Sequence, residues 1–274
     1  MQRFQFYVPE GYDVPTLGEM AEALLAVPGV KLEAGDGYHP GTWRCEDTGA
    51  KAVIDLGDPP LEEDYQHPPR QYLNWTQLSL AIQVPLVGPH WQAVEGFQTI
   101  EAVLAGLPEA VRALDCEDAQ ETPEAEAGPF AWKRPRVLAS WERLHVVQVE
   151  TRTDLARMPR GDSLRLWRWR RERSDGIAAH ANLLWPEARV LRDRATAEAA
   201  AVCVWTDTTK PIALPAAGLV LLAGPEPLLV RRADLPAGSE LTHAGATRVE
   251  PLRQRPTGLP IDRFSACADE DWVD

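Results

Sequence analysis

The 274-residue chain has only four cysteines and no long hydrophobic run. The cysteines stand far apart, so no pair has the spacing of a zinc site or a redox-active dithiol. The longest apolar stretches, such as 218–224, are well short of the ~20 residues that span a membrane. The N-terminal segment does not carry the basic region and apolar run of a signal peptide. These absences predict a cytoplasmic protein with free thiols and no membrane partner.

Recognisable catalytic motifs are lacking as well. The sequence has no phosphate-binding loop with its lysine, no zinc-ligand spacing and no nucleophile elbow around a serine. The glycine-rich stretch 34–41 lacks the lysine and the following helix of a phosphate loop. We therefore expect neither a metal nor an organic cofactor, and we favour a non-enzymatic role.

Charge is distributed very unevenly along the chain. Residues 1–130 contain 22 acidic and 6 basic residues, a net charge of −16, whereas residues 131–274 contain 19 and 22, a net charge of +3. Such asymmetry between halves is typical of two modules that meet different partners. The length and the 45 % apolar composition are enough for two ordinary hydrophobic cores.

Residues 1–115 alternate between strand and helix patterns. Thr16 and Glu19 have the spacing of a capping box at the start of an apolar stripe that predicts a helix. The stripe consists of Leu17, Met20, Ala21, Leu24 and Leu25. Further patterns predict strands over 4–8, 42–46, 52–56 and 78–84 and a helix over 90–105. This order predicts an α+β fold, with a ferredoxin-like α/β sandwich at the N-terminus.

Residues 116–130 have the composition of an acidic linker between two domains. The segment is rich in carboxylates and has no large apolar residue before Phe130, so it cannot bury enough surface to offset its ordering entropy. Residues 131–274 contain many strand-sized apolar segments, among them 143–151 and 163–169. They predict a β-rich second domain that ends in an irregular segment and an acidic tail.

Tryptophans alternate with arginines at 164–173. As a strand, this segment would place Trp167 and Trp169 on one face and Arg168 and Arg170 on the other, with Arg171 beside the tryptophans. Aromatic rings and guanidinium groups together can bind single-stranded nucleic acid. They can also pack as core rings beneath arginine stems or face a protein partner. The acidic first domain would repel a polyanion, which favours packing.

A hydrolytic site is the second alternative for function. His180 is the histidine with the most suitable neighbours, and Asp207 is an acid that could orient it. Catalysis would require a nucleophile such as Cys203 or Ser163 within hydrogen-bonding distance of the histidine. The sequence alone does not place these residues together.

The leading hypothesis is a protein-interaction module. Glu62, Glu63 and Asp64 form an acidic run in the first domain that could contact a basic surface on another protein. Aromatic residues of the same domain could add contact area; they are Tyr65, Tyr72, Trp75 and Trp91. Masking of a basic partner, as in toxin neutralisation or another bacterial defence system, would use such a surface.

Three segments of the second half occur in a recognisable order. They are Trp167-Arg-Trp169, Leu184-Trp-Pro186, and Trp205-Thr-Asp207 leading to Pro211-Ile-Ala-Leu-Pro215. In this order they resemble an uncharacterised bacterial two-domain family with Trp-x-Trp and Trp-Thr-Asp…Pro-Ile-x-Leu-Pro motifs. Arg170 and Arg171 stand where that family has an asparagine. The resemblance implies a two-part architecture and carries no known function.

Overall fold

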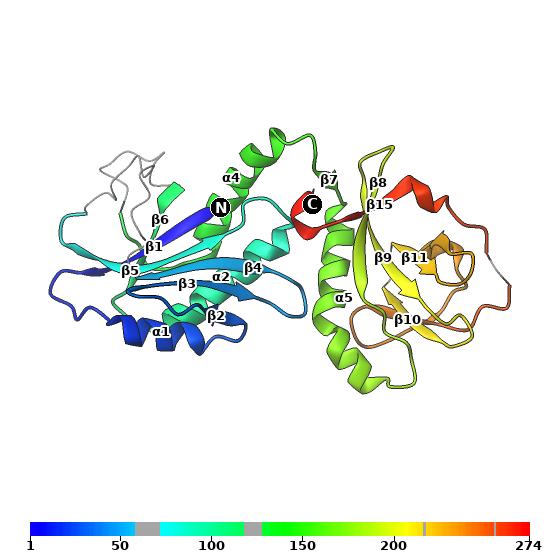
Figure 1. Ribbon diagram of the computed structural model, residues 1–274, viewed down its shortest axis with the longest axis horizontal. Helices are drawn as coiled ribbons and strands as arrows, with labels where there is room; N and C mark the ends of the chain where they lie inside the picture. Colours follow the sequence, from blue (N-terminus) through cyan, green and yellow to red (C-terminus); the bar gives the residue numbers. More distant parts are fainter. Residues whose placement is uncertain (58–71, 118–127, 216–217, 255) are drawn as a thin grey trace. The chain divides into compact units, whose positions relative to one another are not determined.

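A computed structural model describes residues 1–57, 72–117, 128–215, 218–254 and 256–274 (Figure 1). The described chain divides into two compact units. Unit 1 comprises Met1–Leu86 and Gln92–Thr151, and unit 2 comprises Val87–Trp91 and Arg152–Asp274. Both combine helices with sheets, so the predicted α+β class is confirmed. In the described ranges, no helix combines the length and apolarity needed to cross a lipid bilayer.

Unit 1 is built on a six-stranded antiparallel sheet in the order β2-β3-β4-β5-β1-β6. Its strands are β1 (Gln2–Pro9), β2 (Val30–Leu32), β3 (Tyr38–Arg44), β4 (Lys51–Gly57), β5 (Trp75–Val84) and β6 (Arg112–Asp115). Strands β2 to β5 follow one another as a meander, and β1 lies between β5 and β6. The N-terminal strand is therefore central, and its residues 4–8 are all buried.

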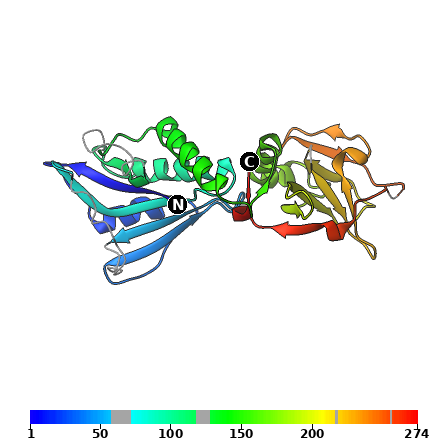
Figure 2. The ribbon, with the colours of Figure 1, turned by 90° about the horizontal axis from the view of Figure 1, so that it is seen from above.

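Helices α1 (Leu17–Leu25), α2 (His90–Ala105) and α4 (Arg134–Glu150) cover one face of this sheet (Figure 2). Phe4 of β1 meets Phe97 of α2 edge-on, with ring centroids 5.8 Å apart. Asp115 lies opposite Phe4 in the β1–β6 register and accepts a hydrogen bond from Ser140 of α4. The apolar core of unit 1 lies between these helices and the sheet.

Helix α4 corrects two sequence predictions. Residues 143–151 form its C-terminal half and the cap that follows it, whereas they were predicted to be a strand. Trp141, fully buried, donates a hydrogen bond from Nε1 to the Pro85 carbonyl at 2.8 Å, which fixes α4 to unit 1. The division between the units therefore falls after Thr151, later than the predicted linker 116–130, of which 118–127 lie outside the described residues. With this division, residues 1–151 carry a net charge of −14 and residues 152–274 a net charge of +1.

Unit 2 packs helix α5 (Arg160–Ala179) against β-sheets. A five-stranded sheet has the order β12-β11-β9-β8-β15, with β9 and β11 parallel. Its strands are β8 (Ala188–Asp193), β9 (Ala199–Trp205), β11 (Leu219–Leu222), β12 (Leu228–Arg231) and β15 (Phe264–Cys267). Smaller sheets join β10 (Ile212–Pro215), β14 (Ala246–Val249) and β13 (Ser239–Glu240), and β16 (Trp272–Val273) with β7 (Ala156–Arg157).

The acidic tail is part of the core of unit 2. Trp272 has no exposed surface and Val273 is 2 % exposed, because β16 pairs in parallel with β7. Trp91 lies beside Trp272 with ring centroids 6.5 Å apart. Trp91 was predicted as an exposed contact residue, but its side chain is buried in this unit.

Candidate binding surface on unit 1

Residues 10–25, the loop after β1 and helix α1, combine exposed acidic and exposed apolar side chains; we call them the α1 surface. The carboxylates of Glu10, Asp13, Glu19 and Glu22 are all exposed. The chain has no lysine or arginine between Arg3 and Lys31. None of the four carboxylates forms an ion pair with any residue that the structure describes. The surface therefore has a concentrated negative charge that the fold does not neutralise.

The same surface exposes four large apolar side chains. Tyr12 is 60 % exposed, Val14 49 %, Leu17 40 % and Leu25 58 %. The sequence pattern placed Leu17 and Leu25 on the buried stripe of the helix, and this was wrong. The buried side chains of α1 are Met20, Ala23 and Leu24. Leu17 and Leu25 lie eight residues apart and so share one stripe of α1 beside the buried face.

The start of α1 is fixed by the predicted capping box, which the structure confirms. Glu19 donates its backbone N–H to Thr16 Oγ1 at 3.3 Å, and the Glu19 carboxylate accepts from the Thr16 backbone N–H at 2.8 Å. The backbone hydrogen bond and the hydroxyl of Thr16 lower the pKa of Glu19. A negative charge is also favourable at a helix N-terminus. Glu19 therefore stays ionised at neutral pH and holds one orientation.

Of the contact residues proposed from the sequence, the acidic run and the tyrosine after it are not part of the α1 surface. Glu62, Glu63, Asp64 and Tyr65 lie outside the described residues. Tyr72 and Trp75, the aromatic neighbours in sequence, are half-buried and pack against Tyr7.

The tryptophan segment 164–173 is helical rather than extended, which corrects the strand predicted over 163–169. Trp169 is fully buried and stacks on Trp185, with centroids 5.3 Å apart. Its Nε1 donates to the Pro186 carbonyl at 3.2 Å. Trp167 is half-buried, and the Arg171 guanidinium lies 5.5 Å from its ring centroid. On a helix the two tryptophans have separate environments, so they do not form one stacking face.

Two arginines of this segment form ion pairs inside unit 2. Arg168 Nε lies 3.0 Å from Glu172 Oε1, one helical turn away. Arg170, whose side chain is 13 % exposed, pairs with Asp269 at 2.8 Å. These contacts give both guanidinium groups a role within the fold.

The residues of the hydrolase alternative have separate partners. His180 ends α5 and lies against Trp185 and His243, with centroids 6.1 Å and 5.6 Å away. The carboxylate of Asp207 accepts from the backbone and hydroxyl of Thr209 and pairs with Lys210. No hydrogen bond joins His180 to Asp207 in the described chain.

Neither proposed nucleophile is accessible. Ser163 is fully buried in α5, and Cys203 is 1 % exposed in β9. Burial raises the pKa of the Cys203 thiol to about 12, so this thiol stays protonated at neutral pH.

The comparisons with known proteins found no match for this chain among family models, curated proteins or solved structures. The resemblance to the Trp-x-Trp family stays a prediction. The function is therefore argued from the residues of the chain itself.

Proposed function

We propose that this protein is a non-enzymatic interaction module of the cytoplasm that binds a partner protein with a basic surface. Unit 1 would provide the contact through its α1 surface. The observation that carries the proposal is the combination of four unneutralised carboxylates with four exposed apolar side chains within residues 10–25.

The two kinds of side chain have different effects on binding. Carboxylates without a cationic partner in the described chain attract a basic partner and accelerate encounter, an effect that salt screens over a Debye length of ~10 Å at 0.1 M. The exposed apolar side chains supply area that contact would remove from water, which slows dissociation. This contact would cover the basic surface of the partner, as in the neutralisation of a toxin.

The net charges of the units support the choice of unit 1. Residues 1–151 carry −14, whereas residues 152–274 carry +1. A basic partner is attracted to the first and meets little net field from the second. A polyanion such as nucleic acid would be repelled by unit 1.

The test begins with capture of partners from the native host on the full chain and on charge variants. Glu22→Lys combined with Asp13→Lys reverses two charges of the α1 surface. Glu109→Lys combined with Asp36→Lys is the matched control, because both are exposed acids of unit 1 outside this surface. We expect one basic protein to be retained by the parent and the control and lost from the double variant.

Association and dissociation rates measured with that partner distinguish the effect of charge from the effect of apolar contact area. The double charge variant should slow association, and the parent should associate more slowly as salt rises from ~50 to ~500 mM. Leu17→Ser with Leu25→Ser should instead accelerate dissociation, because contact area is lost. A captured partner that is acidic, or one that binds all these variants equally, would contradict the proposal.

A further inference from the structure

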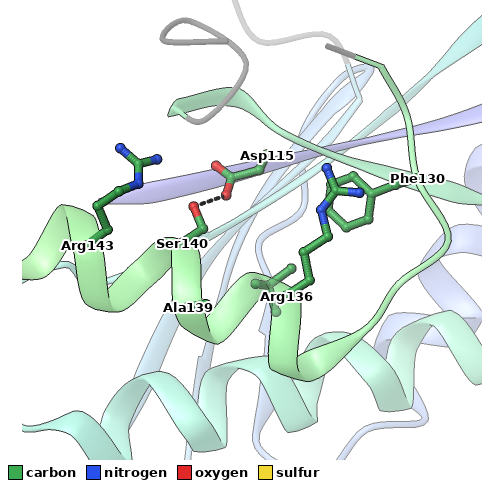
Figure 3. Close-up of a pocket in the computed structure, with 7 residues that line it drawn as sticks. Asp115, Phe130, Arg136, Ala139, Ser140 and Arg143 are labelled. Carbon is green, nitrogen blue, oxygen red and sulfur yellow. Dashed lines mark hydrogen bonds between the residues drawn. The ribbon is translucent and has the colours of Figure 1, made fainter. Parts of the chain in front are cut away.

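Unit 1 also contains a pocket of about 330 Å³ between β6 and α4 (Figure 3). Its polar floor is Asp115, which is 3 % exposed. Asp115 Oδ2 accepts a hydrogen bond from Gln2 Nε2 at 2.6 Å and one from Ser140 Oγ at 2.8 Å. Gln2 is itself fully buried, and its Oε1 has no hydrogen-bond partner among the described residues. Residues from β1, β6 and α4 thus hold this carboxylate in one position.

Two arginines stand at the rim. Arg136 and Arg143 are exposed and lie seven residues apart on α4, so both project to the side of the helix that carries Ser140. Figure 3 shows their guanidinium groups on either side of Asp115 and Ser140, with Ala139 between them on the helix. The small side chain of Ala139 leaves room between the two charges.

Phe130 orients one of the two arginines. The Arg136 guanidinium carbon lies 4.0 Å from the centroid of the Phe130 ring, a cation–π distance. No carboxylate of the described chain forms an ion pair with Arg136. Its guanidinium is therefore held over the apolar face of the Phe130 ring.

The local charge differs in sign from that of unit 1 as a whole. The charged residues that line the pocket are Arg136, Arg143 and Asp115, a net charge of +1 in a unit of −14. The first residues of a helix add a positive field, which favours anions nearby. An anion at this pocket would therefore meet a positive local environment despite the charge of the unit.

We propose that this pocket binds a small ligand that carries an oxyanion, a phosphate or a carboxylate, next to a hydroxyl or amine. Arg136 and Arg143 contact the oxyanion, since guanidinium groups match the geometry of these anions. Asp115 accepts from the neighbouring hydroxyl or amine, and the carbon skeleton packs on Phe130. This site is separate from the α1 surface and does not depend on a protein partner.

Calorimetric titration of the full chain with three small probes tests the proposal. Glycerol 3-phosphate and glycerate share a hydroxylated three-carbon skeleton and carry a phosphate and a carboxylate, respectively. Glycerol is the uncharged control. We expect saturable binding of at least one of the two anions and none of glycerol, and the stronger anion identifies the class of ligand.

Variants assign the binding to this pocket. Arg136→Gln and Arg143→Gln should each weaken it at least about tenfold, the effect of losing a charge-assisted hydrogen bond. Ala139→Leu should abolish it by filling the space between the arginines. Lys133→Gln removes an equal charge from an exposed neighbour outside the pocket and should change affinity less than about twofold. These residues are exposed, so melting curves should stay close to that of the parent.

Two results would overturn the proposal. One is the absence of saturable binding by either anion up to about 10 mM, beyond the range of ordinary specific sites. The other is binding that Lys133→Gln weakens as much as Arg136→Gln, because general attraction to a basic helix would then explain it.

Discussion

Unit 2 and the α1 surface of unit 1 use charged side chains in different ways. In unit 2, arginines form ion pairs within the fold: Arg170 with Asp269, Arg168 with Glu172, and Arg263 with the buried Asp193. On the α1 surface of unit 1, four carboxylates have no cationic partner in the described chain. Charge that is paired locally orders a structure, whereas charge left unpaired over a surface acts on other molecules. The comparison supports the proposal that unit 1 carries the recognition surface.

Aromatic side chains show the same contrast. Unit 2 buries large rings in its core, including Trp91, Trp169, Trp185, Trp205 and Trp272. The α1 surface leaves Tyr12 60 % exposed. Substitutions in unit 2 should therefore change mainly stability, and those on the α1 surface should change mainly binding.

The largest expected effect is at Trp169. Trp169→Ala removes a fully buried ring that stacks on Trp185, so it should lower the free energy of unfolding by ~3–5 kcal/mol. Trp167→Ala, at a half-buried ring two residues away, should cost clearly less. Urea denaturation measures both. Equal losses, or no loss at Trp169, would contradict the packing described for α5.

Gly176 of α5 gives the second effect. A Cβ atom there would clash with the Trp185 ring, so Gly176→Ala should destabilise by ~1–3 kcal/mol. Gly161→Ala is the control on the same helix, where the nearest atom is the flexible Arg165 guanidinium at 3.6 Å. It should leave stability unchanged or raise it by up to ~1 kcal/mol. In thermal melting, Gly176→Ala should lower the melting temperature, whereas Gly161→Ala should leave it unchanged or raise it.

Acid should weaken unit 2 through Asp193. The hydrogen bond from Arg263 lowers the pKa of Asp193 from 3.8 to about 2. A depressed pKa contributes stability that is present above pH ~4 and is lost as the pH falls towards ~2. Asp193→Asn should therefore reduce the loss of stability over this range in urea titrations at several pH values. A variant with the same pH dependence as the parent would exclude this ion pair as a source of acid sensitivity.

The smallest effect on stability is expected on the α1 surface. Glu22→Gln should change the free energy of unfolding by less than ~0.5 kcal/mol, because its exposed side chain has no ion-pair partner in the described chain. Thr16→Ala, which breaks the capping box two turns earlier, should cost ~1 kcal/mol. If Glu22→Gln proved as costly as Thr16→Ala, the surface would have a structural role that the contacts do not show.

Local signals in the sequence predicted much of unit 1. The capping box at Thr16 and Glu19 fixed the start of α1, since both partners are three residues apart. Strands β1, β4 and β5 and helix α2 lie close to the predicted ranges, because each has a clear apolar period and a proline or glycine near an end.

Helices α4 and α5 were missed for a physical reason. Val146, Val147 and Val149 suggested a strand, but the conformation of β-branched residues depends strongly on tertiary contacts. Here these residues lie in helix α4, which the buried Trp141 fixes to unit 1. In α5 the buried residues Ser163, Leu166 and Trp169 are three apart, which is a helical spacing that the interleaved arginines concealed.

The candidate sites were less predictable than the fold. The acidity of residues 10–25 is visible in the sequence, but the exposure of Leu17 and Leu25 depends on how α1 packs on the sheet. In the pocket, Ser140 of α4 donates a hydrogen bond to Asp115 of β6. Because part of α4 was predicted to be a strand, this contact could not be predicted from the sequence. Contacts between distant segments, rather than local pattern, create both sites.

Unit 2 is built from two separate segments of the chain, which affects both its folding during synthesis and its expression as an isolated fragment. Val87–Trp91 belong to unit 2, although unit 1 contains the residues before and after them. Trp91 packs beside Trp272, so the ribosome must synthesise nearly the whole chain before that pair of rings can meet. A gene segment beginning at Arg152 would encode a unit without one of its buried rings. The two units are therefore distinct in structure, but cutting the chain at a single point does not separate them.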